Sequence, residues 1–285
     1  MPFFRRDNEV SIFYEIIDSS HRSSEVCVLL GGLTRDHSIW RKVIPLLKEK
    51  YKILLLDNRD AGQSTSINDQ YKIADLADDV AALMLYLGLS NAHVVGHSMG
   101  GFMALHIAAK YPNLVKTLVL CSTAQKQVPA GIEYLKSRIR LIDSQPNKEA
   151  TTASKEDVIA VLDKLYAEES LRSQSFVEEI ICHETSNNHP QSASSFRRQA
   201  YACINHDATN LVGLINCPTL IITGEKDKYY TPELATELAS KFQQSKAVII
   251  PNTAHMVQIE QPEELVMAFN NFVYEMCHIK SLSVR

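Results

Sequence analysis

The sequence of 285 residues lacks features that mark several large functional classes. Its net charge is only −4, which gives no sign of a nucleic-acid surface or a polybasic membrane patch. No uninterrupted apolar run approaches membrane-spanning length. Residues 1–7 contain a basic pair but no long apolar stretch after it, so we expect no signal peptide.

The sequence also lacks any Cys-x-x-Cys pair and any His and Cys spacing typical of a zinc site. Its six cysteines are scattered along the chain: Cys27, Cys121, Cys182, Cys203, Cys217 and Cys277. Cys27 and Cys121 lie within apolar runs. We therefore expect reduced, mostly buried thiols, no bound metal and a cytoplasmic location.

Short apolar runs alternate with helical patterns through most of the chain. The runs cover residues 26–30, 52–56, 92–95, 117–120, 219–222 and 247–250, and helices are expected over 73–87, 99–110 and 262–274. Runs without polar alternation are typical of strands buried on both faces. The order of elements predicts an α/β fold with a mostly parallel, doubly wound sheet. Residues 10–17 are more irregular and favour an antiparallel edge strand.

The alternation stops between residues 125 and 210, where helical patterns and polar loops occur without a convincing strand. We predict a core domain of residues 1–124 and 211–285, with residues 125–210 as a helical cap (lid) over the site. Basic residues of the cap are mixed with Asp and Glu, which is typical of solvated helix faces; among them are Arg138, Arg140, Lys155, Lys164, Arg172, Arg197 and Arg198.

A Gly-x-Ser-x-Gly pattern at residues 96–100 follows a predicted strand and precedes a predicted helix. A serine at such a turn must adopt a strained backbone, and Gly96 and Gly100 leave room for strand and helix to close around it. The helix start also directs N–H groups and a positive dipole end at a developing oxyanion. The pattern therefore predicts Ser98 as a nucleophile rather than a solvated serine in a glycine-rich turn.

A serine nucleophile needs a base, and the base needs an acid that holds its tautomer. Among ten histidines, His255 lies just after the last predicted strand, at the sheet edge that also carries Ser98. Asp227 follows the preceding strand, and the order Ser98, Asp227, His255 is the one expected for a nucleophile on a strand-to-helix turn. Glu225 is the competing acid. Asp57 also ends a strand and is interpreted as orienting the loop after it.

Two backbone N–H groups should stabilise the oxyanion. One is predicted to be that of Met99, directly after the nucleophile, and the other that of Leu33 in the loop after the first buried strand. The residues predicted to contact substrate are Gly32, His97, Trp40 and Met256. For His97 a structural role is also expected, because side chains of neighbours across such a turn diverge.

Over nearly its whole length the sequence resembles the α/β-hydrolase superfamily. The matching stretches are residues 31–33 with Trp40, 57–64, 96–101, 224–227 with 232–233, and 254–255 with 260–262. Within the superfamily it looks like small cytosolic carboxylesterases, enol-lactonases, carbon–carbon bond hydrolases and pimeloyl-carrier-protein methyl ester esterases. The resemblance implies the α/β-hydrolase fold.

Two positions depart from the pattern of the superfamily. Gly31 stands where a histidine is common, which puts the second oxyanion donor in doubt. Asp60 stands where the first glycine of Arg-Gly-x-Gly is common. We expect Asp60 to pair with Arg59 or to reach toward the pocket. Neither change removes a predicted catalytic group.

These residues predict a serine hydrolase that cleaves a carboxylic ester or thioester through an acyl-enzyme on Ser98, without a metal or organic cofactor. The same triad fits a carbon–carbon bond hydrolase or a lactonase, and the fold alone fits a non-catalytic ligand receptor. Epoxide hydrolases and dehalogenases of this fold use an aspartate nucleophile, so Ser98 argues against them. The expected partner is a small-molecule ester, with docking of an acidic acyl carrier protein on the cap left open. The protein is expected to be a monomer or homodimer.

Overall fold

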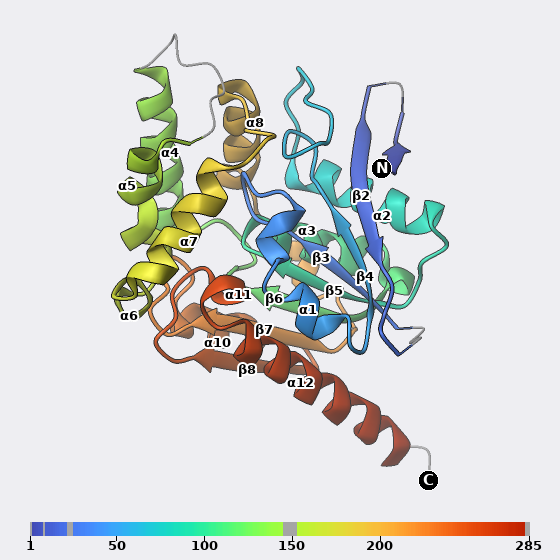
Figure 1. Ribbon diagram of the computed structural model, residues 1–285. Coiled ribbons are helices and arrows are strands. Elements are labelled where there is room, and N and C mark those ends of the chain that lie inside the picture. Colours follow the sequence, from blue (N-terminus) through green and yellow to red (C-terminus); the bar gives the residue numbers. More distant parts are fainter. Residues whose placement is uncertain (1, 8, 22–24, 145–152, 283–285) are drawn as a thin grey trace.

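The computed structural model describes residues 2–7, 9–21, 25–144 and 153–282, with side chains as far as residue 276. One central sheet of eight strands forms the core. Helices cover both faces of this sheet, and a further group of helices stands over the carboxyl ends of its parallel strands (Figure 1).

The strands are β1 (Phe3–Arg5), β2 (Ser11–Ile17), β3 (Val26–Leu30), β4 (Lys52–Leu56), β5 (Ala92–His97), β6 (Val115–Cys121), β7 (Thr219–Gly224) and β8 (Ser245–Ile250). Their order across the sheet is β1-β2-β4-β3-β5-β6-β7-β8. β2 pairs antiparallel with β1 and with β4, and the strands from β4 to β8 pair parallel. The predicted mostly parallel sheet of the α/β class is confirmed.

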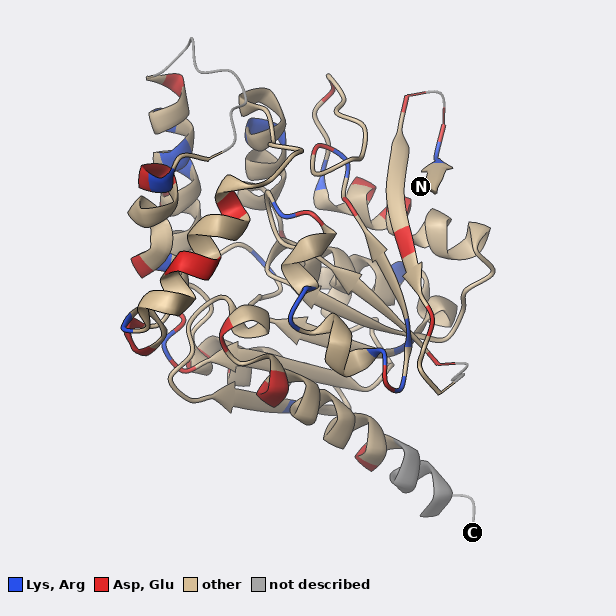
Figure 2. Cartoon of the chain, viewed as in Figure 1, with Lys and Arg blue, Asp and Glu red and all other residues tan. Residues whose placement is uncertain are grey.

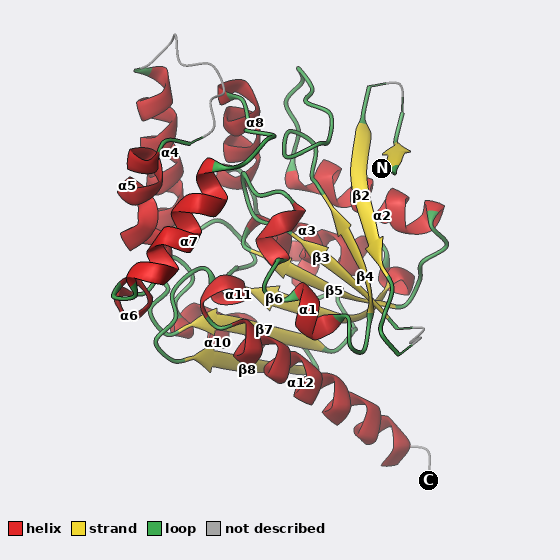
Figure 3. Cartoon of the chain, in the orientation of Figure 1, coloured by secondary structure: helices red, strands yellow, loops and turns green. Residues whose placement is uncertain are grey.

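The α-helices are α1 (Ile44–Leu47), α2 (Ile73–Tyr86), α3 (Met99–Lys110), α4 (Pro129–Asp143), α5 (Lys155–Leu165), α6 (Glu168–Leu171), α7 (Gln174–Thr185), α8 (Ala193–Ile204), α9 (Thr209–Val212), α10 (Pro232–Ala239), α11 (Val257–Glu260) and α12 (Pro262–Leu282). Two short 3₁₀ helices are η1 (His37–Trp40) and η2 (Pro112–Leu114). Figure 3 shows how these helices surround the strands.

Successive residues of the central strands face two different cores. In β3, Val26, Val28 and Leu30 belong to a cluster shared with α2, α3 and α10. Cys27 and Leu29 belong to a second cluster, shared with α1, α11 and α12. Because both faces of the strand are covered, every position is apolar, and each fully buried Leu or Val stabilises the fold by roughly 1.5–3 kcal/mol. This explains the continuous apolar runs in the sequence.

The N-terminal edge of the sheet differs from the expectation. β2 is antiparallel as predicted, but it is not the edge strand, because β1 pairs outside it with Phe3 opposite Phe13. A three-residue strand is too short to show an alternation of apolar and polar residues.

Helices α4 to α8 lie between β6 and β7 and stand over the carboxyl ends of the strands (Figure 1). Among the described residues of this insertion there is no strand, only an isolated antiparallel bridge between Lys126 and Asp207. Two backbone hydrogen bonds flank the bridge, from Gln127 N to His206 O and from Ala208 N to Gln125 O. The chain therefore leaves the core and returns to it at adjacent points. We call residues 125–210 the cap, as in the prediction.

Five cysteines are described and all are free. Cys27, Cys121 and Cys203 are buried, and Cys182 is exposed. The predicted state of Cys277 falls outside the described side chains. No helix within the described part of the chain combines the length and apolar character needed to cross a membrane.

A buried ion pair joins the cap to the core. Asp60 has a φ of 68°, and its carboxylate accepts hydrogen bonds from Nε and Nη2 of Arg198 on α8 at 2.8 and 2.7 Å. The Oγ of Ser195 donates to the same carboxylate. Arg59 instead pairs with Asp79. The expectation that Asp60 pairs with Arg59 or enters the pocket is therefore wrong, and so is the solvated position expected for Arg198.

We predict that Arg198→Leu lowers the free energy of unfolding by about 3 kcal/mol, because it leaves the Asp60 carboxylate buried without a counter-charge. The double variant Asp60→Gly/Arg198→Leu should recover most of this loss, since a glycine suits the positive φ and no buried charge remains. Urea unfolding measures both. Arg197→Leu is the control, because Arg197 pairs with the exposed Asp143 and should cost under about 1 kcal/mol. Equal losses for the two single variants would contradict the prediction.

Candidate active site

Ser98 occupies a strained turn between β5 and α3. Its φ and ψ are 54° and −116°, and it caps the N-terminus of α3. A Cβ atom at Gly96 would lie closer than 3.0 Å to the backbone of Gly100, and one at Gly100 equally close to that of Leu30. The glycines therefore allow the strand and helix to approach closely, which is the geometry expected from the sequence pattern.

His255 is hydrogen-bonded to Asp227 through Nδ1 and Oδ2 at 3.0 Å. The other carboxylate oxygen of Asp227 accepts the backbone N–H groups of Tyr229 and Tyr230 at 2.9 and 3.1 Å. Burial alone would raise the pKa of Asp227, but its interactions with His255 and these two N–H groups outweigh burial and lower that pKa. An ionised Asp227 accepts the Nδ1 proton of His255, which leaves the Nε2 lone pair free to take a proton.

The competing acids occupy other positions. Glu225 is exposed and accepts the backbone N–H of Asn252. Asp57 is fully buried and accepts hydrogen bonds from the backbone N–H and the ring of His37 and from the backbone N–H of Gln63. Asp227 is thus the acid paired with His255, whereas Asp57 orients the loop that follows β4, as the sequence indicates.

The loop that carries His255 is held by the cap and by Glu260. The backbone N–H of His255 donates to the carbonyl of Leu165 at the end of α5, at 3.1 Å. The Glu260 carboxylate accepts the N–H of Ala254 on this loop and the N–H of Ala167 in the cap, at 2.9 and 2.8 Å. Burial raises the pKa of Glu260 despite these bonds. The position of His255 therefore depends on the cap as well as the core.

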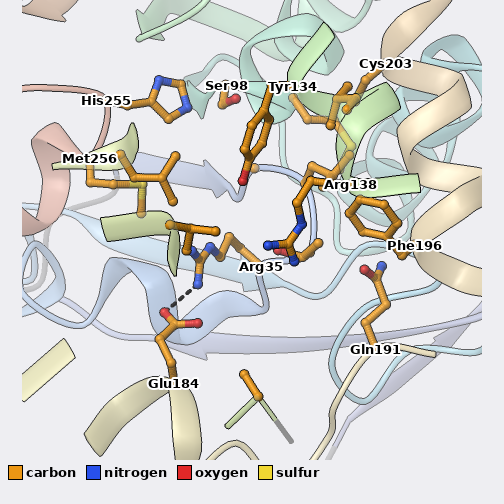
Figure 4. A pocket seen from close by; sticks show the side chains of 18 of the residues that line it. Arg35, Ser98, Tyr134, Arg138, Glu184, Gln191, Phe196, Cys203, His255 and Met256 are labelled. Atoms are coloured by element: carbon orange, nitrogen blue, oxygen red, sulfur yellow. Dashed lines mark hydrogen bonds and ion pairs between the residues drawn. The ribbon is translucent and has the colours of Figure 1, made fainter. Parts of the chain in front are cut away.

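Ser98 and His255 line the same cavity, which has a volume of about 370 Å³. Figure 4 shows their side chains close to one another at one end of it. Within the described residues no hydrogen bond joins Ser98 Oγ to His255 Nε2. Such contacts are often long in a site without substrate and shorten when substrate binds.

The two predicted oxyanion donors also line this cavity. Leu33 and Met99 are part of its wall, and among the described residues neither backbone N–H has an acceptor. A Cβ at Gly32 would be 3.4 Å from the Cβ of Ser98, so the loop lies directly against the nucleophile. The loop is fixed by Thr34, which has a φ of 68° and donates its N–H to Gln199 Oε1 of the cap at 3.0 Å.

Three of the four predicted substrate contacts, Gly32, His97 and Met256, line the cavity. Trp40 does not. Its side chain is fully buried in the core between η1 and the sheet. A tryptophan close to the oxyanion loop in sequence is therefore part of the packing beneath the loop, and we do not retain it as a substrate contact.

Sequence reasoning missed several residues of the cavity wall. Arg35 follows the oxyanion loop and forms an ion pair with Glu184 of α7 (Figure 4). Burial would raise the pKa of Glu184, but Arg35 and His183 lower it to about 2. Tyr134 and Arg138 enter the cavity from α4. Arg138 therefore does not occupy the solvated face expected for it. The sequence pattern predicts helices in the cap, but it does not indicate which face of each helix packs toward the core.

His97, next to the nucleophile, is buried and is hydrogen-bonded to the backbone of the base, His255. Its Nε2 donates to the carbonyl of His255 at 2.8 Å, and the two rings lie 4.9 Å apart between centroids. Burial, followed by the nearby His255, lowers the pKa of His97 to about 3. His97 thus stays neutral and fixes the backbone of the base, in line with the structural role expected for it.

Among the described residues, no three His, Cys, Asp or Glu side chains gather in a way that could hold a metal ion.

The comparisons with known proteins agree with this architecture. The profile of the family described as alpha/beta hydrolase fold matches residues 26–262. The chain is 25% identical over 247 residues to the (E)-2-((N-methylformamido)methylene)succinate hydrolase of Acinetobacter baylyi, covering 86% of this chain and 88% of that protein. The chain belongs to the α/β-hydrolase fold family, and the hydrolases form the enzyme class to which it is related.

Solved structures show the same fold at low sequence identity. An enol-lactonase from Burkholderia xenovorans superposes with a TM-score of 0.80 at 23% identity, covering 96% of this chain and 100% of that one. A thermophilic esterase from Thermogutta terrifontis, solved with malate bound, superposes with a TM-score of 0.79 at 24% identity, covering 96% of each chain.

We predict that His97 makes stability depend on pH. Its pKa is about 3 in the folded protein and about 6.5 when unfolded, so the unfolded state binds the extra proton between these values. The contribution of neutral His97 is complete above pH 6.5 and is lost progressively as pH falls toward 3. Between pH 7.5 and 5 the wild type should lose about 2 kcal/mol more of its unfolding free energy than His97→Gln.

Urea unfolding at the two pH values measures this difference. Glutamine keeps a donor for the His255 carbonyl but does not titrate. His189→Gln is the control, because His189 is exposed in the cap and its loss should leave the wild-type pH dependence intact. The same pH dependence in His97→Gln and wild type would show that His97 is not the titrating group.

Proposed function

We propose that the protein is a serine hydrolase that cleaves a carboxylic ester or thioester through an acyl-enzyme on Ser98. One observation carries the proposal: the strained serine turn, His255 with Asp227 behind it, and two N–H groups that have no acceptor among the described residues come together, with Ser98, His255, Leu33 and Met99 lining a single cavity. The membership in a hydrolase fold family supports hydrolytic chemistry.

In the proposed mechanism, Ser98 Oγ attacks the carbonyl carbon of the ester while His255 Nε2 takes the hydroxyl proton. Asp227 holds Nδ1–H and stabilises the imidazolium that forms. The carbonyl oxygen becomes an oxyanion, which accepts hydrogen bonds from the N–H groups of Leu33 and Met99. His255 then gives its proton to the leaving alcohol or thiol.

The acyl-enzyme is released by reversal of the same roles. His255 takes a proton from water, whose oxygen attacks the acyl carbon, and the oxyanion donors act a second time. The product acid then leaves, and Ser98 recovers its proton from His255. Every catalytic group in this proposed cycle is a side chain or backbone group of the chain itself.

The substrate in this proposal is a free small molecule that fits a cavity of about 370 Å³. Helices α4 to α8 together carry Lys and Arg as well as Asp and Glu, with only acidic residues on α7 and only basic ones on α8 (Figure 2). Docking of an acidic carrier protein on the cap therefore stays a prediction of the sequence and is not part of the mechanism proposed here.

We predict that Ser98→Ala abolishes labelling by a fluorophosphonate and lowers kcat on short p-nitrophenyl esters by at least about 10⁴-fold, because the nucleophile is lost. Asp227→Asn should lower kcat by about 10⁴-fold, because an amide favours the wrong tautomer of His255. Steady-state kinetics of the purified variants measures both effects.

Glu225→Gln is the matched control, since Glu225 is the neighbouring exposed acid and should keep kcat within about twofold of wild type. A chain that is neither labelled nor active on any ester, or a Ser98→Ala variant as active as wild type, would overturn the proposed mechanism. Ligand binding without turnover would then favour the receptor alternative.

A further inference from the structure

Arg138 is the charged residue on the cavity face of α4. The residues of this helix that line the cavity recur at intervals of three or four, so they share one face; they are Gly131, Tyr134, Leu135, Arg138, Leu141 and Ile142. The neighbouring basic residues Lys136 and Arg140 are exposed on other parts of the helix surface. The position of Arg138 is therefore distinct from that of an ordinary solvated cap residue.

Arg138 differs from the other arginine of the cavity wall in its lack of an ion pair with any described carboxylate. The wall contains four charged residues, Arg35, Arg138, Asp157 and Glu184. Arg35 and Glu184 form an ion pair. The Asp157 carboxylate accepts the N–H of Ser154 in the capping box of α5. The four charges sum to zero, but Arg138 forms no ion pair with any carboxylate of the described residues, so its guanidinium donors are available to a ligand in the cavity.

The surroundings of Arg138 favour an anion in the cavity. Its guanidinium lies over the ring of Phe196 at 6.0 Å, and Figure 4 shows it directed into the cavity toward Arg35. Leu135 and Ile142 provide apolar wall on its own helix. A guanidinium beside apolar groups interacts more strongly with an anion than one in open solvent, and its planar donors match a carboxylate in a bidentate way.

We propose that Arg138 binds a free carboxylate of the substrate, so that the preferred substrates are esters that carry a second, ionised carboxyl group. This inference rests on the proposed function, because it names the substrate class of the same site. In this proposal Ser98 and His255 act on the ester at one end of the cavity. Arg138 binds the second carboxylate of the same substrate, which takes no part in the reaction.

The test compares monomethyl esters of succinate, glutarate and adipate with the neutral methyl esters of butanoate, pentanoate and hexanoate, followed by proton release. In wild type the carboxylate esters should have the higher kcat/KM. Arg138→Met keeps an unbranched side chain similar to the aliphatic part of arginine but removes the guanidinium and its charge. It should lower the ratio of kcat/KM between carboxylate and neutral esters by about 10- to 100-fold, mainly through KM.

Two further variants separate recognition from a structural effect. Arg140→Met, on the same helix but outside the cavity, should leave the ratio at its wild-type value. Arg138→Lys keeps the charge but loses the bidentate fork, so it should recover part of the preference. An unchanged ratio in Arg138→Met, or an equal fall in Arg140→Met, would overturn the inference.

Isothermal titration with glutarate distinguishes a failure of this inference from a failure of the proposed function, because binding needs no turnover. If wild type hydrolyses none of the esters but binds glutarate, and Arg138→Met weakens that binding at least tenfold, ester hydrolysis is wrong and the carboxylate site stands. If wild type hydrolyses neutral esters but Arg138→Met binds glutarate as tightly as wild type does, the carboxylate site is wrong and ester hydrolysis stands.

Discussion

The close approach of β5 to α3 at Ser98 is the constraint on which the rest of the site depends. Glycines at positions 96 and 100 let the backbones meet at a distance that any side chain would prevent. Ser98 is consequently held at a φ of 54°, a conformation that costs of order 1–3 kcal/mol for a residue with a side chain. The hydrogen bonds from Ser98 N to Cys121 O and from Thr123 Oγ1 to Ser98 O hold it there. The core thus stabilises a strained turn whose hydroxyl faces the cavity.

The cap does more than cover the site, because it also forms hydrogen bonds that position the core loops of the site. The N–H of Thr34, next to a predicted oxyanion donor, is accepted by Gln199 of α8. The N–H of His255 is accepted by the Leu165 carbonyl at the end of α5. The Asp60–Arg198 pair fixes α8 to the loop after β4. Since buried polar groups lose free energy when their partners are removed, each contact links the position of a core loop to the folding of the cap.

The sequence was informative wherever a local pattern determines the structure. Buried strands showed as apolar runs, and the turn at Ser98 showed as glycines at fixed spacing. Contacts between distant segments leave no such pattern: Asp60 and Arg198 are 138 positions apart, and nothing near either residue identifies its partner. Trp40 illustrates the opposite case. It is close to the oxyanion loop in the sequence, but its side chain does not line the cavity. Periodicity likewise revealed the α4 helix without revealing that the face with Arg138 meets the site.

The charged residues of the site fall into two groups: those that are paired with one another, and Arg138, which is not. Asp227 is hydrogen-bonded to His255 and Glu184 forms an ion pair with Arg35, so these groups hold one another in position. A half-buried arginine without a matching carboxylate among the described residues contributes little to stability, and an apolar residue of similar size would pack against Phe196 at least as well. Its presence is therefore better explained by an anion that arrives with the ligand. On this argument Ser98 determines how the bond is broken, and Arg138 determines which molecules reach it in a productive orientation.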